Sequence, residues 1–287
     1  MKTTFLNHIS DCALTELKPT VMALGFFDGV HLGHRQLIEK SKHISQLKGL
    51  ELAVLTFFPH PKEVLNQVKF NYLISLDKKI EILEQLGVDR LYIVHFDKEF
   101  ASLEPETFVE NYLISLQVKE VVAGFDFTYG NKGLGNMKTL EAHGKGAFRV
   151  TMLPKVELYG KKISSTLIRQ FLSDGQVEQI AEYLGDYYLT KGAIHQAHPY
   201  SDFTSKVRLE VSFFNTAPKC GMYEVEISLD PHTFESICDI YNGESGEILV
   251  EIEVPGYINI DNHEGLTIKW LNQSSKKTVK MLQEANI

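Results

Sequence analysis

An apolar run passes directly into a helical pattern in the segment Val21-Met-Ala-Leu-Gly-Phe-Phe-Asp-Gly-Val-His-Leu-Gly-His-Arg-Gln-Leu-Ile38. Residues Val21–Leu24 have the continuous apolar character of a buried strand. Gly29 and Gly33 permit tight turns and let the backbone approach a ligand closely. The segment therefore predicts a strand, a loop and a helix N-terminus that together form a cradle.

Two histidines of this cradle, His31 and His34, are three residues apart. A first helical turn that includes both directs their imidazoles to one side, beside unpaired N–H groups and the positive end of the helix dipole. We interpret this arrangement as a polyphosphate site. Two alternatives stay open. Zinc ligands would need further partners, and no CxxC or HExxH motif supplies them. A packed core position is disfavoured because the flanking glycines and Asp28 suggest an open site.

The composition is that of an ordinary globular protein. The chain has 287 residues, of which 44% are hydrophobic and 23% charged, and its formal net charge is -8. This length leaves room for one large or two medium domains, each with a core. A net negative charge argues against a sequence-independent nucleic-acid binder, which needs an excess of lysine and arginine.

The compartment is indicated by cysteine use and by hydropathy. Cys12, Cys220 and Cys238 are odd in number and widely spaced, which fits a reducing compartment without structural disulfides or a zinc motif. Met1–Ser10 lacks the apolar core of a signal peptide, and no stretch approaches the roughly 18 apolar residues of a membrane span. We therefore expect a cytoplasmic protein that has no membrane partner.

Strand and helix patterns alternate through the first two thirds of the chain. This order predicts an α/β fold with a Rossmann-like, doubly wound parallel sheet and right-handed crossovers. Ser75 is the expected N-cap of one helix, and Ser102 the expected N-cap of another that carries Pro105 in its first turn. The further expected strands are Glu51–Phe57, Arg90–Val94, Glu120–Gly124 and Phe148–Leu153, and the expected helices are Leu76–Leu86, Ser102 to about Leu116, Asn136–His143 and Val177–Leu184.

The pattern changes to period two beyond Asp186, where we place a domain boundary. Residues 1–186 form the first predicted domain and residues 187–287 the second. Alternating segments predict a small antiparallel β-barrel, followed by a terminal helix at Thr278–Ala285. The expected strands of this barrel are Lys206–Phe214, Met222–Ser228, Glu247–Val254 and Leu266–Leu271.

Two further segments follow the carboxyl ends of predicted strands, where open α/β sheets bind ligands. In Thr56-Phe-Phe-Pro-His-Pro61, two prolines fix the backbone around His60, which indicates a binding residue or merely a stiff turn. In Gly124-Phe-Asp-Phe-Thr-Tyr-Gly130, alternate aromatic residues flank Asp126. They predict either a wall for a flat ring or a strand that simply continues into a glycine-rich loop.

An anion site is predicted at Ile163-Ser-Ser-Thr-Leu-Ile-Arg169. Ser164 or Ser165 can cap a helix whose first-turn amides face outward, and Arg169 lies one turn further along. Hydroxyls, amides and a guanidinium that converge on one point suit an anion. The alternative is an ordinary capped helix with an arginine in solvent.

Together, these four segments resemble the HxGH nucleotidylyltransferase superfamily. The form is that of the prokaryotic FAD synthetases, the bifunctional riboflavin kinase/FMN adenylyltransferases, and the resemblance is close over roughly residues 20–187. It implies transfer of AMP from ATP to FMN with Mg²⁺, and it assigns no protein ligand to the metal. The implied catalytic residues are His31, His34 and Arg169. The implied ATP-binding residues are Gly25, Phe26, Phe27, Asp28, Gly33, His34, Ser164, Ser165, Thr166 and Arg169, and the implied FMN-binding residues are His60, Pro61, Asp126 and Phe127.

The resemblance fails in the second domain. The family's kinase has a Pro-Thr-Ala-Asn motif, which is absent from Gly192–Lys206, whereas Pro218–Tyr223 still resembles a retained turn. Glu251 falls roughly where the kinase's base would lie, but Pro255–His263 departs from the pattern. We expect a folded domain that is inactive as a kinase and that offers a surface for docking or for homo-oligomer formation. The open alternatives are residual kinase activity, an acceptor other than FMN, and a flavin-binding regulatory protein without turnover.

Overall fold

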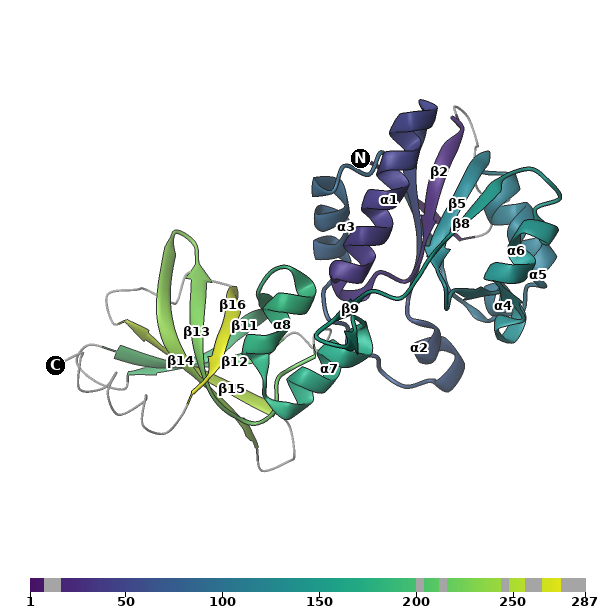
Figure 1. Ribbon diagram of the computed structural model, residues 1–287. Helices are drawn as coiled ribbons and strands as arrows, with labels where there is room; N and C mark the ends of the chain where they lie inside the picture. The colour runs from purple at the N-terminus through teal and green to yellow at the C-terminus, as the bar shows by residue number, and fades with distance from the viewer. Residues whose placement is uncertain (8–16, 200–203, 212–215, 244–247, 256–264, 275–287) are drawn as a thin grey trace. The chain divides into compact units, whose positions relative to one another are not determined.

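The computed structural model describes residues 1–7, 17–199, 204–211, 216–243, 248–255 and 265–274. The chain divides into two compact units (Figure 1). The first unit contains residues 1–70 and 76–163, and the second contains residues 71–75 and 164–287. The predicted terminal helix Thr278–Ala285 lies outside the described residues. Assigning a separate activity to each side of residue 186 stays a prediction.

A parallel six-stranded sheet forms the centre of the first unit, as the sequence predicts. Its strands β2 and β3 are buried along most of their length, because helices cover the sheet and leave little of these strands in contact with water. An edge strand that the sequence patterns did not indicate, β1, pairs with β4. The strand order across the sheet is β1 (Lys2–Leu6), β4 (Arg90–His95), β3 (Glu51–Phe58), β2 (Thr20–Leu24), β5 (Val118–Gly124) and β8 (Arg149–Leu153).

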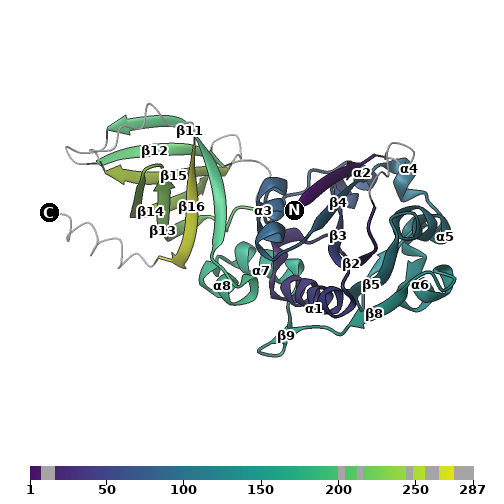
Figure 2. The same cartoon turned by 90° about the horizontal axis from the view of Figure 1, so that it is seen from above.

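Helices lie on both faces of this sheet (Figures 1 and 2). On one face α1 (Leu32–Lys48) packs against β2, β3 and β5, and α3 (Leu76–Gln85) lies beside it. On the other face α5 (Pro105–Val109) and α6 (Met137–His143) enclose an aromatic core. Alternate residues of β2 reach this second core, so the sheet buries both faces. The doubly wound fold is confirmed.

The expected long helix beginning at Ser102 is wrong. Asp97 caps a short helix, α4 (Lys98–Ala101), and Ser102 is its C-cap, whose hydroxyl donates to the Glu99 carbonyl. The next helix begins at Pro105, and it continues as a π-helical turn, η3 (Glu110–Ile114). Proline suits this first helical position because its missing N–H has no partner there. A serine hydroxyl also bonds a helix C-terminus, which sequence alone did not separate from an N-cap.

The second unit contains a closed antiparallel barrel, which confirms the predicted architecture. Two of its strands, β11 (Tyr188–Pro199) and β14 (His232–Asn242), were not among the expected segments. The remaining strands are β12 (Thr204–Val211), β13 (Gly221–Leu229), β15 (Ile248–Pro255) and β16 (Gly265–Gln273). Two helices, α7 (Ser165–Asp174) and α8 (Val177–Leu184), precede the barrel. No helix among the described residues is long and apolar enough to cross a membrane.

Candidate functional site

The loop between β2 and α1 has an unusual backbone. Phe27 and Val30 both adopt positive φ, at 54° and 39°, beside Gly29 at 80°. Left-handed conformations are costly for residues that have a Cβ and persist only where the surroundings enforce them. Phe27 is fully buried, and its ring would lie 3.0 Å from a Cβ on Gly25. Gly25 therefore leaves the space that this ring occupies.

His31 and His34 form one stacked pair at the start of α1. Their ring centroids are 3.6 Å apart with an interplanar angle of 11°. His31 is the N-cap, and its Nδ1 accepts a hydrogen bond from the His34 N–H at 3.2 Å. A neutral His31 therefore carries its proton on Nε2. The Nδ1 of His34 is buried and has no hydrogen-bond partner among the described residues. The pair thus offers polar nitrogens that the surrounding protein does not fully use.

The expectation of an open site at this pair holds only in part. His31 is only 6% exposed and Asp28 only 2%, whereas His34 is half-buried. The rings stack on each other, and the centroid of the Phe27 ring lies 5.1 Å from the centroid of the His34 ring. Burial disfavours the charged form of an imidazole. It lowers the pKa of His31 to about 4 and the pKa of His34 well below its ordinary value. Both side chains are therefore neutral at pH 7.

Acid should destabilise the fold through these histidines. Their folded-state pKa values lie below 6.5, so the unfolded chain binds more protons as the pH falls from 6.5 toward 4. The stability that the neutral pair contributes is complete above pH 6.5 and is lost through that window. We expect His31→Asn, which keeps an N-cap acceptor, to show a shallower fall in the free energy of unfolding. Urea unfolding of both proteins at pH 7.5, 6 and 4.5 measures this slope, and equal slopes contradict the expectation.

A second group surrounds the Phe26 side chain. The His60 ring contacts it edge-on with centroids 4.5 Å apart, and His60 stacks on Phe70 at 3.6 Å and 9°. His60 is also the N-cap of α2 (Pro61–Asn66), and its Nδ1 accepts from the Lys62 N–H at 3.0 Å. The turn that begins α2 therefore also fixes the orientation of the His60 ring. Whether His60 and Pro61 bind a ligand stays a prediction.

The predicted aromatic segment brings a charged pair near the histidines. Asp126 bonds Lys162 at 2.5 Å, and the Lys162 ammonium lies 4.8 Å from the centre of the Phe125 ring. Both charges act on His31, since Lys162 lowers its pKa and Asp126 raises it. Phe127 stacks on Tyr129 with centroids 6.1 Å apart. The first unit therefore gathers this segment and the histidine pair within electrostatic range.

Two side chains to which the sequence analysis gave no role form hydrogen bonds with the backbone of the loop between β2 and α1. Lys79 Nζ and Thr56 Oγ1 both donate to the Phe26 carbonyl, at 2.8 and 2.9 Å. Lys79 is only 1% exposed. Lys79 lies one turn before the buried Leu83 in α3. A lysine on the buried face of a helix is the signal that could have identified it.

The remaining predicted residues, Ser164 to Arg169, belong to the second unit. Ser164 caps α7 by accepting from the Leu167 N–H at 3.2 Å, as one of the two predicted capping choices requires. The Arg169 guanidinium donates to the carbonyls of Ser165 and Asn71, at 3.3 and 3.2 Å. A phosphate-binding role for this segment stays a prediction.

The described carboxylates do not form a metal centre. Within the described part of the chain, no three histidine, cysteine, aspartate or glutamate side chains lie close enough to hold a metal ion. Asp28, the carboxylate in the loop before the histidine pair, is buried and interacts electrostatically with Lys79. These residues therefore do not fit a metal held by protein side chains alone.

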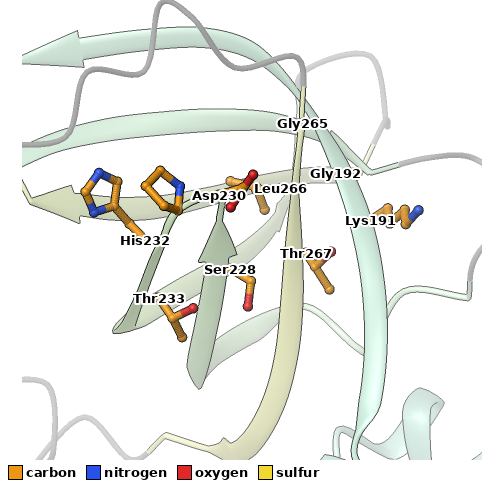
Figure 3. Close-up of a pocket in the computed structure, with 10 residues that line it drawn as sticks. Lys191, Gly192, Ser228, Asp230, His232, Thr233, Gly265, Leu266 and Thr267 are labelled. Carbon is orange, nitrogen blue, oxygen red and sulfur yellow. The ribbon is translucent and has the colours of Figure 1, made fainter.

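The barrel carries a pocket of about 510 Å³ between the β13–β14 turn and the strands β11 and β16 (Figure 3). Lys191, Asp230, His232 and Thr267 are among the residues that line it. None of the predicted ATP-binding or FMN-binding residues lies in this pocket.

Comparison with known proteins gives consistent matches. The model of the family described as FAD synthetase matches residues 13–167. A bifunctional riboflavin kinase/FMN adenylyltransferase from Listeria monocytogenes is 38% identical over 281 residues, covering 94% of this chain and 88% of the relative. The protein of the same description from Bacillus subtilis is 42% identical over 246 residues, covering 84% and 77%. A crystal structure described as a macrolide-efflux protein from Streptococcus pneumoniae has a TM-score of 0.84 at 25% identity, covering 99% of this chain and 97% of that chain.

Proposed function

Because the chain belongs to the FAD synthetase family, we propose that it transfers AMP from ATP to FMN. It is an FMN adenylyltransferase, a nucleotidyltransferase of FAD biosynthesis. An oxygen of the FMN phosphate attacks the α-phosphorus of ATP, and the bond from that phosphorus to the bridging β-phosphate oxygen breaks. FAD and pyrophosphate are the products. The stacked histidine pair at the start of α1 is the structural observation that best supports this reaction.

The pair suits a reaction between two anions. No covalent enzyme intermediate is needed, so the protein has to align the reactants and stabilise charge on the phosphoryl oxygens. A neutral imidazole donates one hydrogen bond from its protonated nitrogen. His31 donates from Nε2, because its Nδ1 already accepts from the His34 N–H. We assign His31 and His34 to the phosphates of ATP.

The other phosphate contacts are assigned to α7. Its first residues, Ser165 and Thr166, follow the Ser164 cap, so their backbone N–H groups lie at a helix N-terminus. The Arg169 guanidinium is oriented by its hydrogen bonds to two backbone carbonyls of its own unit. In this proposal these groups bind the β- and γ-phosphates, while Gly25 to Asp28 and Gly33 bring the loop backbone to the nucleotide.

Arg169→Lys should raise the KM for ATP more than the KM for FMN. The planar guanidinium matches phosphate oxygens in pairs, which a single ammonium does not reproduce. Initial rates with each substrate varied in turn measure the two constants. Equal increases in both constants would mean that Arg169 supports the whole site and not the ATP phosphates.

The flavin side is assigned to the two aromatic groups of the first unit. The edge-on contact of Phe26 and His60 and the stack of His60 on Phe70 create flat surfaces next to the loop. Asp126, Phe127, His60 and Pro61 are the proposed FMN contacts. Mg²⁺ enters as the counter-ion of ATP, since the described carboxylates do not form a site for it. A cytoplasmic location and assembly into a homo-oligomer belong to the same proposal.

Product formation tests this function directly. Purified protein, FMN, ATP and Mg²⁺ should give FAD and pyrophosphate in equal amounts, separated by chromatography. Replacing FMN by another phosphorylated acceptor distinguishes a different nucleotidylyltransferase. Binding of FMN without formation of FAD would instead support a regulatory protein and contradict the proposed activity.

A further inference from the structure

A single buried lysine connects the two sides of the candidate site. Lys79 donates to the Phe26 carbonyl at 2.8 Å, and its ammonium lies 4.5 Å from the centre of the Phe26 ring. That ring contacts His60 on the proposed flavin side. The positive charge of Lys79 also acts on His34, whose pKa it helps to lower. The Lys79 ammonium therefore contacts Phe26, on the proposed flavin side, and acts electrostatically on His34, on the proposed ATP side.

The charge of Lys79 has a defined counterpart. Asp28 is also buried, and its attraction raises the pKa of Lys79 while burial lowers it, with a net pKa of about 8. Burying an ammonium is costly even when it is paired, and replacing a whole buried ion pair by apolar side chains of similar volume often gives a more stable protein. Core packing alone therefore does not account for a lysine at this position. The loop that it contacts has positive φ at Phe27 and Val30 and needs external support.

We propose that Lys79 is a positioning residue for adenylyl transfer. Its ammonium holds the loop from Phe26 to Asp28 in the conformation that places His34 against the phosphates and the Phe26 ring against His60. This inference rests on the proposed function. Lys79 does not act on the substrate itself, because its Nζ is buried beneath the loop.

The inference gives a specific dependence on pH. The titratable groups that face Lys79 are Asp28 from the loop and His34 from α1. The supporting form is protonated, so activity should fall as the pH rises through about 8, the pKa of Lys79. Lys79→Arg keeps its charge at higher pH, so its activity should persist further into the alkaline range.

Lys79→Met should lower kcat for FAD formation roughly tenfold to a hundredfold, because a charged hydrogen bond that orients the site is lost. Its Tm should fall, because Asp28 is left buried without its counter-charge, so kcat is measured well below the unfolding transition. Thr56→Val removes a neutral hydrogen bond from the same carbonyl and should have a smaller effect. Lys78→Met is the matched control, because Lys78 is partly exposed on the same helix and pairs with Glu81 at 2.8 Å. It should keep the wild-type kcat.

Rates and thermal unfolding of these variants between pH 6.5 and 9.5 test the inference. A low kcat in folded Lys79→Met, together with loss of the alkaline decline, supports it. Wild-type kcat in Lys79→Met overturns it while leaving FAD synthesis by the wild-type protein intact. If Lys79→Met does not fold, the profile of Lys79→Arg decides, and an alkaline decline that stays at the wild-type pH overturns the inference. Failure of the wild-type protein to make FAD would instead contradict the proposed function.

Discussion

The variants His31→Ala and His34→Ala are expected to form FAD about a hundredfold more slowly than the wild-type protein. Removing one positioned donor from a site where charge develops typically costs on the order of 3 kcal/mol of transition-state stabilisation. Each imidazole is neutral and held by stacking at 3.6 Å, so its orientation is set before substrate binds. The loss should appear in kcat, measured by FAD formation at saturating ATP and FMN.

The stability of each variant is the control for this experiment, and the capping role of His31 predicts a different stability for each substitution. His31 caps α1, so His31→Ala should also cost about 1 kcal/mol of stability. His31→Asn restores a capping acceptor without restoring the imidazole. It should therefore recover the stability but not the turnover. Wild-type turnover in folded His31→Ala and His34→Ala would show that neither histidine takes part in the reaction.

The fold of the first unit was largely readable from the sequence because its signals are local. Buried parallel strands such as Val21–Leu24 are continuous apolar runs, and glycines end several of the helices that connect them. The edge strand β1 and the barrel strand β14 were missed for the opposite reason. Their residues are mostly exposed or half-buried, so neither gives a strong period. Their pairing partners, which lie far away in the sequence, decide their structure.

The candidate site was predictable only in part. The motif residues His31, His34 and His60 could be named, but the burial of His31 and the stacking of all three rings depend on tertiary packing. Lys79 was missed because its partner, the Phe26 carbonyl, belongs to the backbone and leaves no trace in a motif. A single sequence reveals residue types at a site more readily than the network that orients them.

The barrel's charged cluster bears on the second activity named for the relatives, riboflavin phosphorylation. Lys206 lies 3.1 Å from one oxygen of Glu251, and the Tyr241 hydroxyl donates to the other at 3.4 Å. Asp239 on β14 lies opposite Glu251 on β15, and burial together with the charge of Glu251 raises the pKa of Asp239. A carboxylate that serves as a general base must be within reach of the proton it abstracts. Both oxygens of Glu251 already have partners within the barrel.

The full-length protein is expected to form no FMN from riboflavin and ATP with Mg²⁺, under oxidising or reducing conditions. Phosphoryl transfer needs donors and a metal gathered around the γ-phosphate, and the segment Gly192–Lys206 lacks the Pro-Thr-Ala-Asn motif that would gather them. Because any FMN formed would be converted to FAD, both products must be measured, and the same preparation supplied with FMN must make FAD. Sustained FMN or FAD formation from riboflavin that is lost in Glu251→Gln would show that the barrel still phosphorylates riboflavin. That outcome would mean that Glu251 takes part in phosphorylation, although its carboxylate contacts Lys206 and Tyr241 in this structure.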